Sequence, residues 1–398
     1  MVRSLTWSQV WGWRLARHNL LEAAPREQLS DVVGAVCGIH AQVMASAELS
    51  ICVRVAGMTR QDVVTELWQR RRLVKTYGIR GTIHLFPADE LSMWLAALRA
   101  STQPDRSTRR QEGELDADHE NSVVQAIGDA LDGHRLTRDE LGREVADRIG
   151  VWVLEEAFPA WGGSWPRWWT AIGAAALRGL ACFGPNQGNR VTFVRPNQWL
   201  GPQPQVSGEH ALREVVRRYL TAYGPATAGE FAQWFSMEPR AAKALFRSLA
   251  GELEEVDVQG DRRWARAVDL SHAWTPARDS LRLVPRFDCF VVGGFPRDRL
   301  IPPDRVERAS ARGMTTTWTK SARPLLSGPT PVLLVNGSVA GVWEYKRQGR
   351  RLEVAVEPLA RLSARNERRL QAEAARMGAI LGLEASLVLR EVRTRPHL

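Results

Sequence analysis

Apolar residues recur at helical spacing through the first part of the chain. Trp7, Trp11 and Leu15 are four residues apart, which puts their side chains on one face of a helix. Further helical segments lead to 74–86, a stretch rich in β-branched and aromatic residues and broken by two glycines, as is typical of a β-hairpin. Helices followed by a β-ribbon are the winged-helix plan, so we predict a first winged-helix unit over residues 1–100.

A polar run without apolar periodicity, 101–120, follows this unit and is predicted to be a connector. The helical pattern then resumes. Thr137, followed three residues later by Glu140, forms a capping-box signature that predicts the start of a helix. Residues 181–195 have the pattern of two strands joined by a turn. Together these features predict a second winged-helix unit over 121–200.

The same order of elements recurs after a proline-rich linker. Residues 206–270 contain three apolar-periodic segments and then a ribbon that turns at Gly260-Asp261. Repetition of one plan at similar spacing is the signature of tandem units. We therefore predict three winged-helix units in all.

From Leu281 the pattern changes to short strands. Asn336-Gly337 between two apolar runs is a strong hairpin signal. The predicted fold class is thus α+β, with the tandem winged helices followed over 281–398 by a small sheet or partial barrel and a bracing helix. The elements predicted there are strands at 281–284, 290–292, 352–356 and 387–392, the hairpin within 331–345, and a helix over 359–381.

The charge of the chain favours a polyanionic partner. The 398 residues carry a net charge of +10, and most of the basic residues are arginines. Without a basic amphipathic helix of the membrane-surface kind, nucleic acid is the leading candidate. Two basic clusters are either solvated surface or a rim that follows phosphates. Their members are Arg308, Arg312, Lys320 and Arg323 in one, and Lys346, Arg347, Arg350 and Arg351 in the other.

The expected cellular compartment and the expected absence of a bound metal both follow from features that the sequence lacks. No segment has the uncharged apolar length of a membrane span, and the amino terminus has no signal-peptide core, so we expect a cytoplasmic protein. The four cysteines are scattered without CxxC pairs, which is typical of reduced thiols. Cys37 and His40 have the spacing of half a metal site, but no second pair matches it. We expect no metal and no cofactor.

The segment 37–44 holds the candidate chemistry. Upstream apolar residues recur at helical spacing, yet two residues that can position water, His40 and Gln42, stand two apart. Residues two apart point in divergent directions on a helix but share a side of extended backbone. If they cooperate, the helix must end near Gly38, which tolerates such a break. The alternative is that His40 is a hydrogen-bonded core histidine and Gln42 caps a turn.

Several short motifs follow one another along the chain: His40-Ala41-Gln42, Arg80-Gly81-Thr82-Ile83-His84, Tyr223-Gly224-Pro225-Ala226-Thr227 with Phe231 and Trp234, Pro285-Arg286-Phe287-Asp288, Val335-Asn336-Gly337 and Gly341-Val342-Trp343. In this order they resemble the winged-helix DNA glycosylases of the AlkZ/YcaQ type, over nearly the whole chain. In that family a Gln-x-Gln or Gln-x-Asp triplet carries base excision, and here His40 and Gln42 occupy its place, with histidine as a departure at the first position.

The resemblance implies a monofunctional glycosylase that acts on double-stranded DNA carrying alkylated bases. An N7-alkylated guanine is cationic and leaves readily, so the enzyme has only to place a water at C1′. A neutral imidazole at His40, with an ordinary pKa of about 6.5, can accept the proton of that water, while Gln42 holds it. An abasic site would remain. We expect a monomer that acts on bulky N7-guanine adducts or crosslinks, in self-resistance to an alkylating natural product or in general repair.

The residues expected to contact DNA come from the second motif and from the basic clusters. They are Arg80, Thr82, His84, Lys320, Arg323, Lys346, Arg347 and Arg350. His84 is equally compatible with a strand residue bonded to its neighbour. Asp288 either faces the site or orients Arg286, and the sequence leaves both open.

Two non-catalytic functions compete with the glycosylase. A transcription regulator built from tandem winged helices needs a base-reading helix and usually a dimer, and the chain has no coiled-coil seam. A repair accessory would bind damaged DNA without cutting it.

Overall fold

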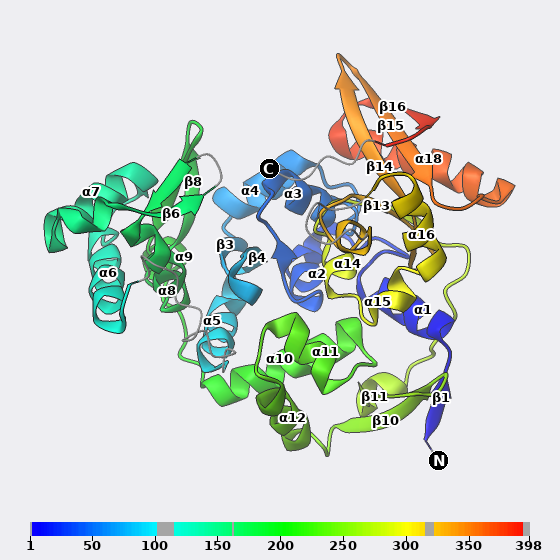
Figure 1. Ribbon diagram of the computed structural model, residues 1–398, viewed down its shortest axis with the longest axis horizontal. Helices are drawn as coiled ribbons and strands as arrows, with labels where there is room; N and C mark the ends of the chain where they lie inside the picture. The colour runs from blue at the N-terminus through cyan, green and yellow to red at the C-terminus, as the bar shows by residue number, and fades with distance from the viewer. Residues whose placement is uncertain (1, 102–114, 161–162, 315–321, 393–398) are drawn as a thin grey trace. The chain divides into compact units, whose positions relative to one another are not determined.

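The computed structural model describes residues 2–101, 115–160, 163–314 and 322–392 (Figure 1). These residues gather in two compact units. The first spans the ranges Met1–Val64, Val216–Phe231 and Lys243–His397, and the second spans Thr65–Val215 and Ala232–Ala242. The fold is mixed α+β, as predicted. None of the helices in the described ranges is long and apolar enough to cross a membrane.

The first unit begins with a short strand and a buried helix. Thr6 closes a capping box at the start of this helix, and the predicted apolar stripe of Trp7, Trp11 and Leu15 is buried, with at most 6% exposure. The strand β1 pairs in parallel with one arm of the predicted ribbon. The elements are β1 (Arg3–Leu5), α1 (Trp7–Arg17), α2 (Leu29–Ala35), β2 (Ile39–His40), α3 (Met44–Cys52), α4 (Arg60–Trp68), β10 (Leu253–Val258), β11 (Asp261–Arg266) and α13 (Ala267–Leu270).

Among the described residues, five strands of the first unit form one sheet in the order β12-β13-β14-β15-β16. Neighbours are antiparallel except β15 and β16, and a β-bulge interrupts the β13–β14 register at Leu333/Leu334. Helix α18 packs on this sheet, where Gly378 allows close approach to Ala385. The predicted small sheet with a bracing helix is thus confirmed. The bounds are β12 (Leu281–Val284), β13 (Val332–Val335), β14 (Ser338–Gln348), β15 (Arg351–Pro358), β16 (Glu384–Leu389) and α18 (Ala364–Leu381).

One predicted strand of this region is wrong. Residues 290–292 lie in α14 (Cys289–Gly293), where the Asp288 side chain accepts from the Phe290 amide as an N-cap. A short, fully buried apolar run has the same composition in a strand and in a helix, so periodicity cannot separate them. The bracing helix begins at Ala364, after the Ser363 cap, and the last strand ends at Leu389. Among the described residues, α14 is followed before the hairpin by α15 (Arg297–Leu300), α16 (Pro303–Ala311) and α17 (Arg323–Leu326).

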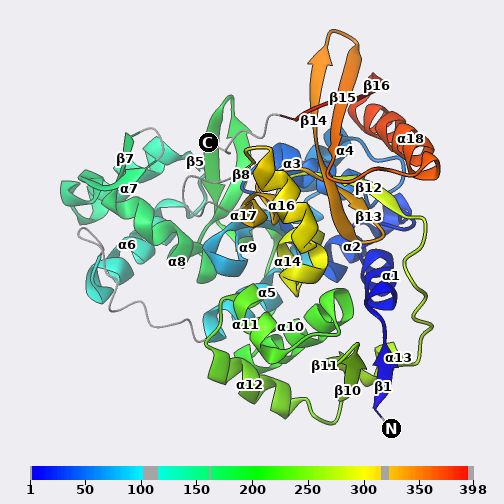
Figure 2. The same cartoon turned by 45° about the vertical axis from the view of Figure 1, so that its right-hand side comes forward.

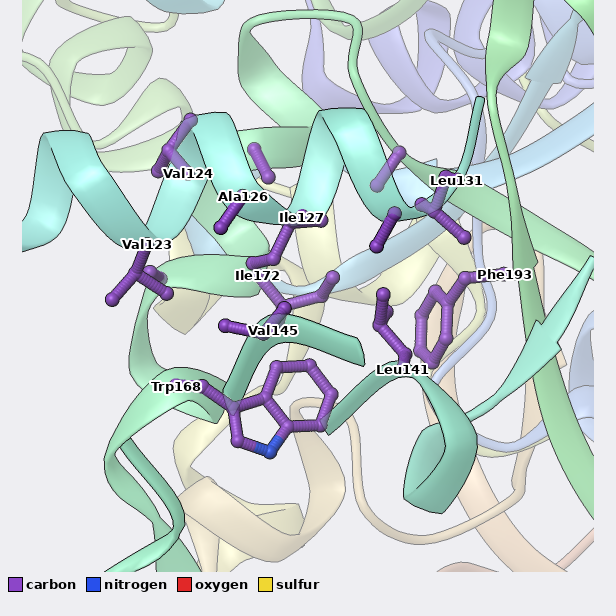
Figure 3. Packing of buried hydrophobic residues seen from close by; sticks show 14 of the residues in the cluster. Val123, Val124, Ala126, Ile127, Leu131, Leu141, Val145, Trp168, Ile172 and Phe193 are labelled. Atoms are coloured by element: carbon purple, nitrogen blue, oxygen red, sulfur yellow. The ribbon is translucent and has the colours of Figure 1, made fainter. Parts of the chain in front are cut away.

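The second unit contains the predicted hairpin at 74–86 as an antiparallel pair, β3 with β4. The capping box at Thr137 and Glu140 is confirmed at the start of α7. Apolar side chains of α6, α7, α8 and β9 pack together with Trp168 and form the core (Figure 3). The elements are β3 (Leu73–Tyr77), β4 (Ile83–Pro87), α5 (Leu91–Ala100), α6 (Ala117–Ala130), β5 (Leu136–Thr137), α7 (Arg138–Ile149), β6 (Glu156–Ala160), β7 (Gly163–Pro166), α8 (Ile172–Leu177), β8 (Cys182–Gln187), β9 (Arg190–Val194) and α9 (Pro196–Leu200).

The helices predicted after the proline-rich linker are present. They are α10 (Gly208–Tyr223), α11 (Ala228–Phe235) and α12 (Pro239–Ser248), and each has residues in both units. Of the predicted connector 101–120, residues 102–114 lie outside the described part of the chain.

Candidate active site

The helix that leads into the candidate motif stops just before it. Helix α2 ends at Ala35, and Cys37 and Gly38 take the positive φ angles of 64° and 87°. The Gly38 amide turns back to donate to the Val33 carbonyl at 2.9 Å, which closes the helix end. The predicted break near Gly38 is therefore confirmed, and its cause is this left-handed pair of residues.

His40 ends the two-residue strand β2 that follows the break, and Gln42 lies in the bend after it. The intervening Ala41 is fully buried, as is Ile39 at 1% exposure, whereas His40 is half-buried and Gln42 is exposed. Alternating burial of this kind is the pattern expected of side chains that share one side of an extended chain.

Tyr223 fixes the end of α2 through a hydrogen bond to the backbone. Its hydroxyl donates to the Val36 carbonyl at 3.0 Å, immediately before the left-handed turn. Burial raises the pKa of Tyr223 well above its ordinary value, so the hydroxyl keeps the proton that it donates. The ring fits against Gly293, where an added Cβ would lie 2.4 Å from the ring. Tyr223, part of one of the sequence motifs, thus holds the backbone at Val36, just before the candidate segment.

A buried arginine holds the residues that follow Tyr223. The Arg14 guanidinium donates to the carbonyls of Gly224 at 3.3 Å, Pro225 at 3.1 Å and Phe295 at 2.5 Å. Burial lowers the pKa of Arg14 to about 10, which still leaves it charged at neutral pH. Three carbonyls from two loops therefore share one cation, and this fixes the backbone beside Tyr223.

Phe287 lies beside the His40 ring. The two ring centroids are 4.9 Å apart with an interplanar angle of 36°. Phe287 has a positive φ of 59°, which is unusual for a bulky residue, and its amide donates to the Gly328 carbonyl at 2.6 Å. The surrounding structure must therefore hold this residue in place, and it restricts one side of the His40 imidazole.

Asp288 anchors this loop from the interior. Its carboxylate accepts two 2.7 Å hydrogen bonds from Arg54 and one of 2.6 Å from Ser50, and the side chains of the ion pair are fully buried. Burial alone would raise the pKa of Asp288, but the Arg54 charge, together with the hydrogen bonds from Arg54, Ser50 and the Phe290 amide, holds it below its ordinary value. Asp288 is therefore a buried anion with its own partner.

Sequence reasoning missed Arg54, because both interpretations of Asp288 placed its partner elsewhere. A signal was present: Arg54 stands inside the apolar run 49–55. A single arginine in such a run is rarely buried without a carboxylate. In the structure neither prediction for Asp288 describes its main contact, which is this ion pair.

The second predicted motif belongs to the second unit. Arg80 adopts a positive φ of 60° in the turn between β3 and β4, and the Thr82 hydroxyl donates to the Ile79 carbonyl at 3.0 Å. His84 is buried at 4% exposure, stacks on Phe86 with centroids 5.5 Å apart, and has Nδ1 at 3.0 Å from the Thr82 carbonyl. Thr82 and His84 thus stabilise the hairpin.

The second basic cluster lies on the β14–β15 hairpin, which projects from the sheet (Figure 2). Lys346, Arg347 and Arg350 are all exposed near its turn. Lys346 and Arg350 form no ion pair with another described residue. These cations are free to meet an external anion.

The first basic cluster is mostly engaged within the fold. Arg308 donates to the Leu359 carbonyl at 3.0 Å, and Arg312 pairs with the buried Glu357 at 2.6 Å. Arg323 is half-buried at the start of α17. Lys320 lies outside the described residues. Within the described ranges, no three His, Cys, Asp or Glu side chains gather in a way that could hold a metal.

Comparison with known proteins matches nearly the whole chain. A family model described as DNA glycosylase AlkZ-like matches residues 33–380. A Streptomyces sahachiroi protein named interstrand DNA cross-link repair glycosylase is 31% identical over an aligned length of 397 residues, and the alignment covers 95% of this chain and 97% of the relative. The solved structure of Streptomyces sahachiroi DNA glycosylase AlkZ superposes with a TM-score of 0.80 at 30% identity, covering 97% of this chain and 100% of that one.

Proposed function

This chain belongs to the AlkZ-like DNA glycosylase family and is a DNA glycosylase, and from this premise we propose that it excises N7-alkylated guanines from duplex DNA and leaves an abasic site. Because the chain belongs to a family of glycosylases, the two non-catalytic functions considered above, a transcription regulator and a repair accessory, are no longer needed to explain it. The observation that supports the proposal is the break after α2, beyond which the more accessible His40 and Gln42 flank the buried Ala41 and His40 lies beside the Phe287 ring.

The proposed reaction needs one water and no covalent intermediate. Water oxygen attacks C1′ as the N9–C1′ bond breaks, and the bonding electron pair neutralises the cationic guanine. The neutral His40 imidazole accepts the water proton, and the Gln42 amide orients the water and stabilises the sugar cation through its carbonyl oxygen. Neither side chain is used as a nucleophile, so strand cleavage is not part of the reaction.

Histidine at the first catalytic position has a consequence for acid pH. A glutamine amide does not titrate in the physiological range. An ordinary imidazole takes up a proton at about pH 6.5. A protonated His40 can no longer accept the water proton. Excision by this chain is therefore expected to fall in mild acid, in contrast with a glutamine variant.

The proposed path of the DNA backbone uses the predicted basic residues. The exposed tip of the β14–β15 hairpin supports it, since Lys346 and Arg350 have no internal ion pair among the described residues. The full proposed set is Arg80, Thr82, His84, Lys320, Arg323, Lys346, Arg347 and Arg350. His84 acts in it by holding the hairpin, because its side chain is buried.

We further propose a substrate too large for a closed base pocket. The Streptomyces sahachiroi relative is named for interstrand cross-link repair, and a crosslinked base cannot be swung out of the duplex. Three tandem winged-helix units, over 1–100, 121–200 and 206–270, would curve around the DNA and bring the pair to the sugar. Action as a monomer, and a role in self-resistance to an alkylating natural product, complete the proposal.

Strand breakage tests the activity directly. The purified protein is incubated with a duplex that carries one N7-alkylguanine, and the DNA is then heated in mild base. Breaks at the modified position, and none without the heating step, are expected for a monofunctional glycosylase. Intact DNA after heating would refute the proposed reaction, and breaks before heating would refute its monofunctional character.

A further inference from the structure

A cavity of about 430 Å³ lies in the first unit next to the candidate active site. Its volume is within the range of small-molecule sites, roughly 300 to 1,000 Å³. The walls come from the first turns of α3, from β14 and from two loops. The lining residues are Val43, Ala45, Ser46, Leu49, Pro285, Arg286, Pro329, Thr330, Pro331, Trp343, Glu344, Tyr345 and Val392.

Two backbone connections join the cavity to the catalytic pair. Val43 is the residue after Gln42 and precedes α3 as its N-cap. Arg286 is the residue before Phe287, whose ring touches that of His40. If the sugar of the modified nucleotide lies at His40 and Gln42, a group attached to its base is therefore close to this cavity.

The walls offer an apolar and aromatic surface. Trp343 and Tyr345 stand two residues apart on β14 and so share a face, with ring centroids 5.9 Å apart. The Trp343 indole N–H donates to the Val284 carbonyl at 2.8 Å and the residue is 1% exposed, so Tyr345, at 39%, supplies the accessible aromatic surface. Pro285, Pro329 and Pro331 extend this surface. Flat apolar groups are bound well by such walls.

The polar groups of the cavity argue against the modified guanine itself. Glu344 is engaged by Arg390 at 2.8 Å, while Arg286 makes no hydrogen bond or ion pair with another described residue. An N7-alkylguanine is cationic, so the Arg286 charge repels it. Its hydrogen-bonding edges would also lose water without finding enough partners on these walls. A neutral apolar group meets neither penalty.

We propose that this cavity binds the neutral, aromatic appendage of a bulky N7-guanine adduct, while the guanine remains outside. The inference deepens the proposed function and rests on it, since the adduct must be carried by the base that is excised. The cavity then determines specificity: it favours adducts that bear a flat apolar group over a simple methyl group.

A graded set of adducts tests this. One guanine in a fixed duplex is made N7-methyl, N7-benzyl or N7-(naphthylmethyl), and single-turnover excision is measured with the spontaneous rate subtracted. We expect the wild type to cut the naphthylmethyl adduct at least about 10-fold faster than the methyl adduct, because differential binding of the appendage is used at the transition state.

Two variants and a control connect the preference to the cavity. Ala45→Phe fills the space, and Tyr345→Ala removes an aromatic wall; each should lower the naphthylmethyl rate about 10-fold or more and change the methyl rate less than about 3-fold. Ala375→Phe, on the exposed face of α18, is the matched control and should change neither rate. Thermal melting identifies a variant that has lost its fold.

Affinity separates failure of this inference from failure of the proposed function. The methyl and naphthylmethyl duplexes are also made with a 2′-fluoro sugar, which slows base loss, and their Kd values are compared. If the wild type cuts no duplex, the proposed reaction fails, and the affinity ratio and its loss in Ala45→Phe still judge the cavity. Equal rates and equal affinities for the two adducts, or variants that slow both adducts alike, would overturn the inference.

Discussion

The Arg54 guanidinium and the Asp288 carboxylate face each other through two 2.7 Å hydrogen bonds, and neither side chain reaches solvent. The pair joins α3 to the loop that carries Phe287. Since Phe287 lies against the His40 ring in a left-handed conformation, the ion pair acts on the active site from a distance. Arg54 and Asp288 are positioning residues, and neither is expected to touch the substrate.

Removing one partner of this pair should be strongly destabilising. Arg54→Met leaves the Asp288 carboxylate buried without its cation, which typically costs about 3 to 5 kcal/mol. The control Arg148→Met breaks an ion pair with Glu144 that is largely exposed, and should cost less than about 1 kcal/mol. Urea denaturation measures both. An Arg54→Met protein as stable as the control would show that the pair does not hold the loop.

The same pair predicts how stability depends on pH. The folded pKa of Asp288 is depressed, so the unfolded chain takes up a proton first as pH falls. The stabilisation is then complete above the ordinary aspartate pKa of about 3.9 and is lost as pH falls through the lower folded value. The stability advantage of the wild type over Asp288→Asn should shrink below about pH 4. A difference that stays constant from neutral pH to pH 3 would contradict this.

Tyr223→Phe tests the support behind the catalytic segment. The change removes the donor to the Val36 carbonyl and leaves that buried acceptor unsatisfied, at a cost of about 1 to 3 kcal/mol. Because Val36 precedes the left-handed turn at Cys37, excision should also slow at a temperature where the variant is fully folded. Thermal unfolding and single-turnover excision measure the two effects. An unchanged rate would confine Tyr223 to a role in stability.

Charge reversal at the hairpin tip should change the salt dependence of DNA binding. Each phosphate contact contributes about −0.9 to the slope of log affinity against log salt. Lys346→Glu with Arg350→Glu should therefore flatten the slope by roughly one to two units, whereas Arg368→Glu on the exposed face of α18 should change it little. Titration of undamaged duplex at several salt concentrations gives the slopes. Equal slopes for the tip variant and wild type would place the DNA on another face.

Local signals predicted much of the fold and the end of the helix before the candidate site. The capping box at Thr137 was visible because its two residues are close in sequence, and the helix break before His40 followed from the directions of side chains two apart. The Arg54–Asp288 pair was not predicted, because 234 positions separate its members and only tertiary packing joins them. Helix α14 was mistaken for a strand, since its cap, Asp288, is itself held by that pair.

The account places the reaction at His40 and Gln42, and the most direct test is single-turnover excision of an N7-alkylguanine by the alanine variants. His40→Ala and Gln42→Ala should each lower the rate by about 10 to 10⁴-fold, the range for loss of a proton-transfer or positioning group, with DNA affinity close to wild type. His40→Gln should keep part of the activity and lose the fall in mild acid. If both alanine variants cut at the wild-type rate, the segment is structural and the site lies elsewhere.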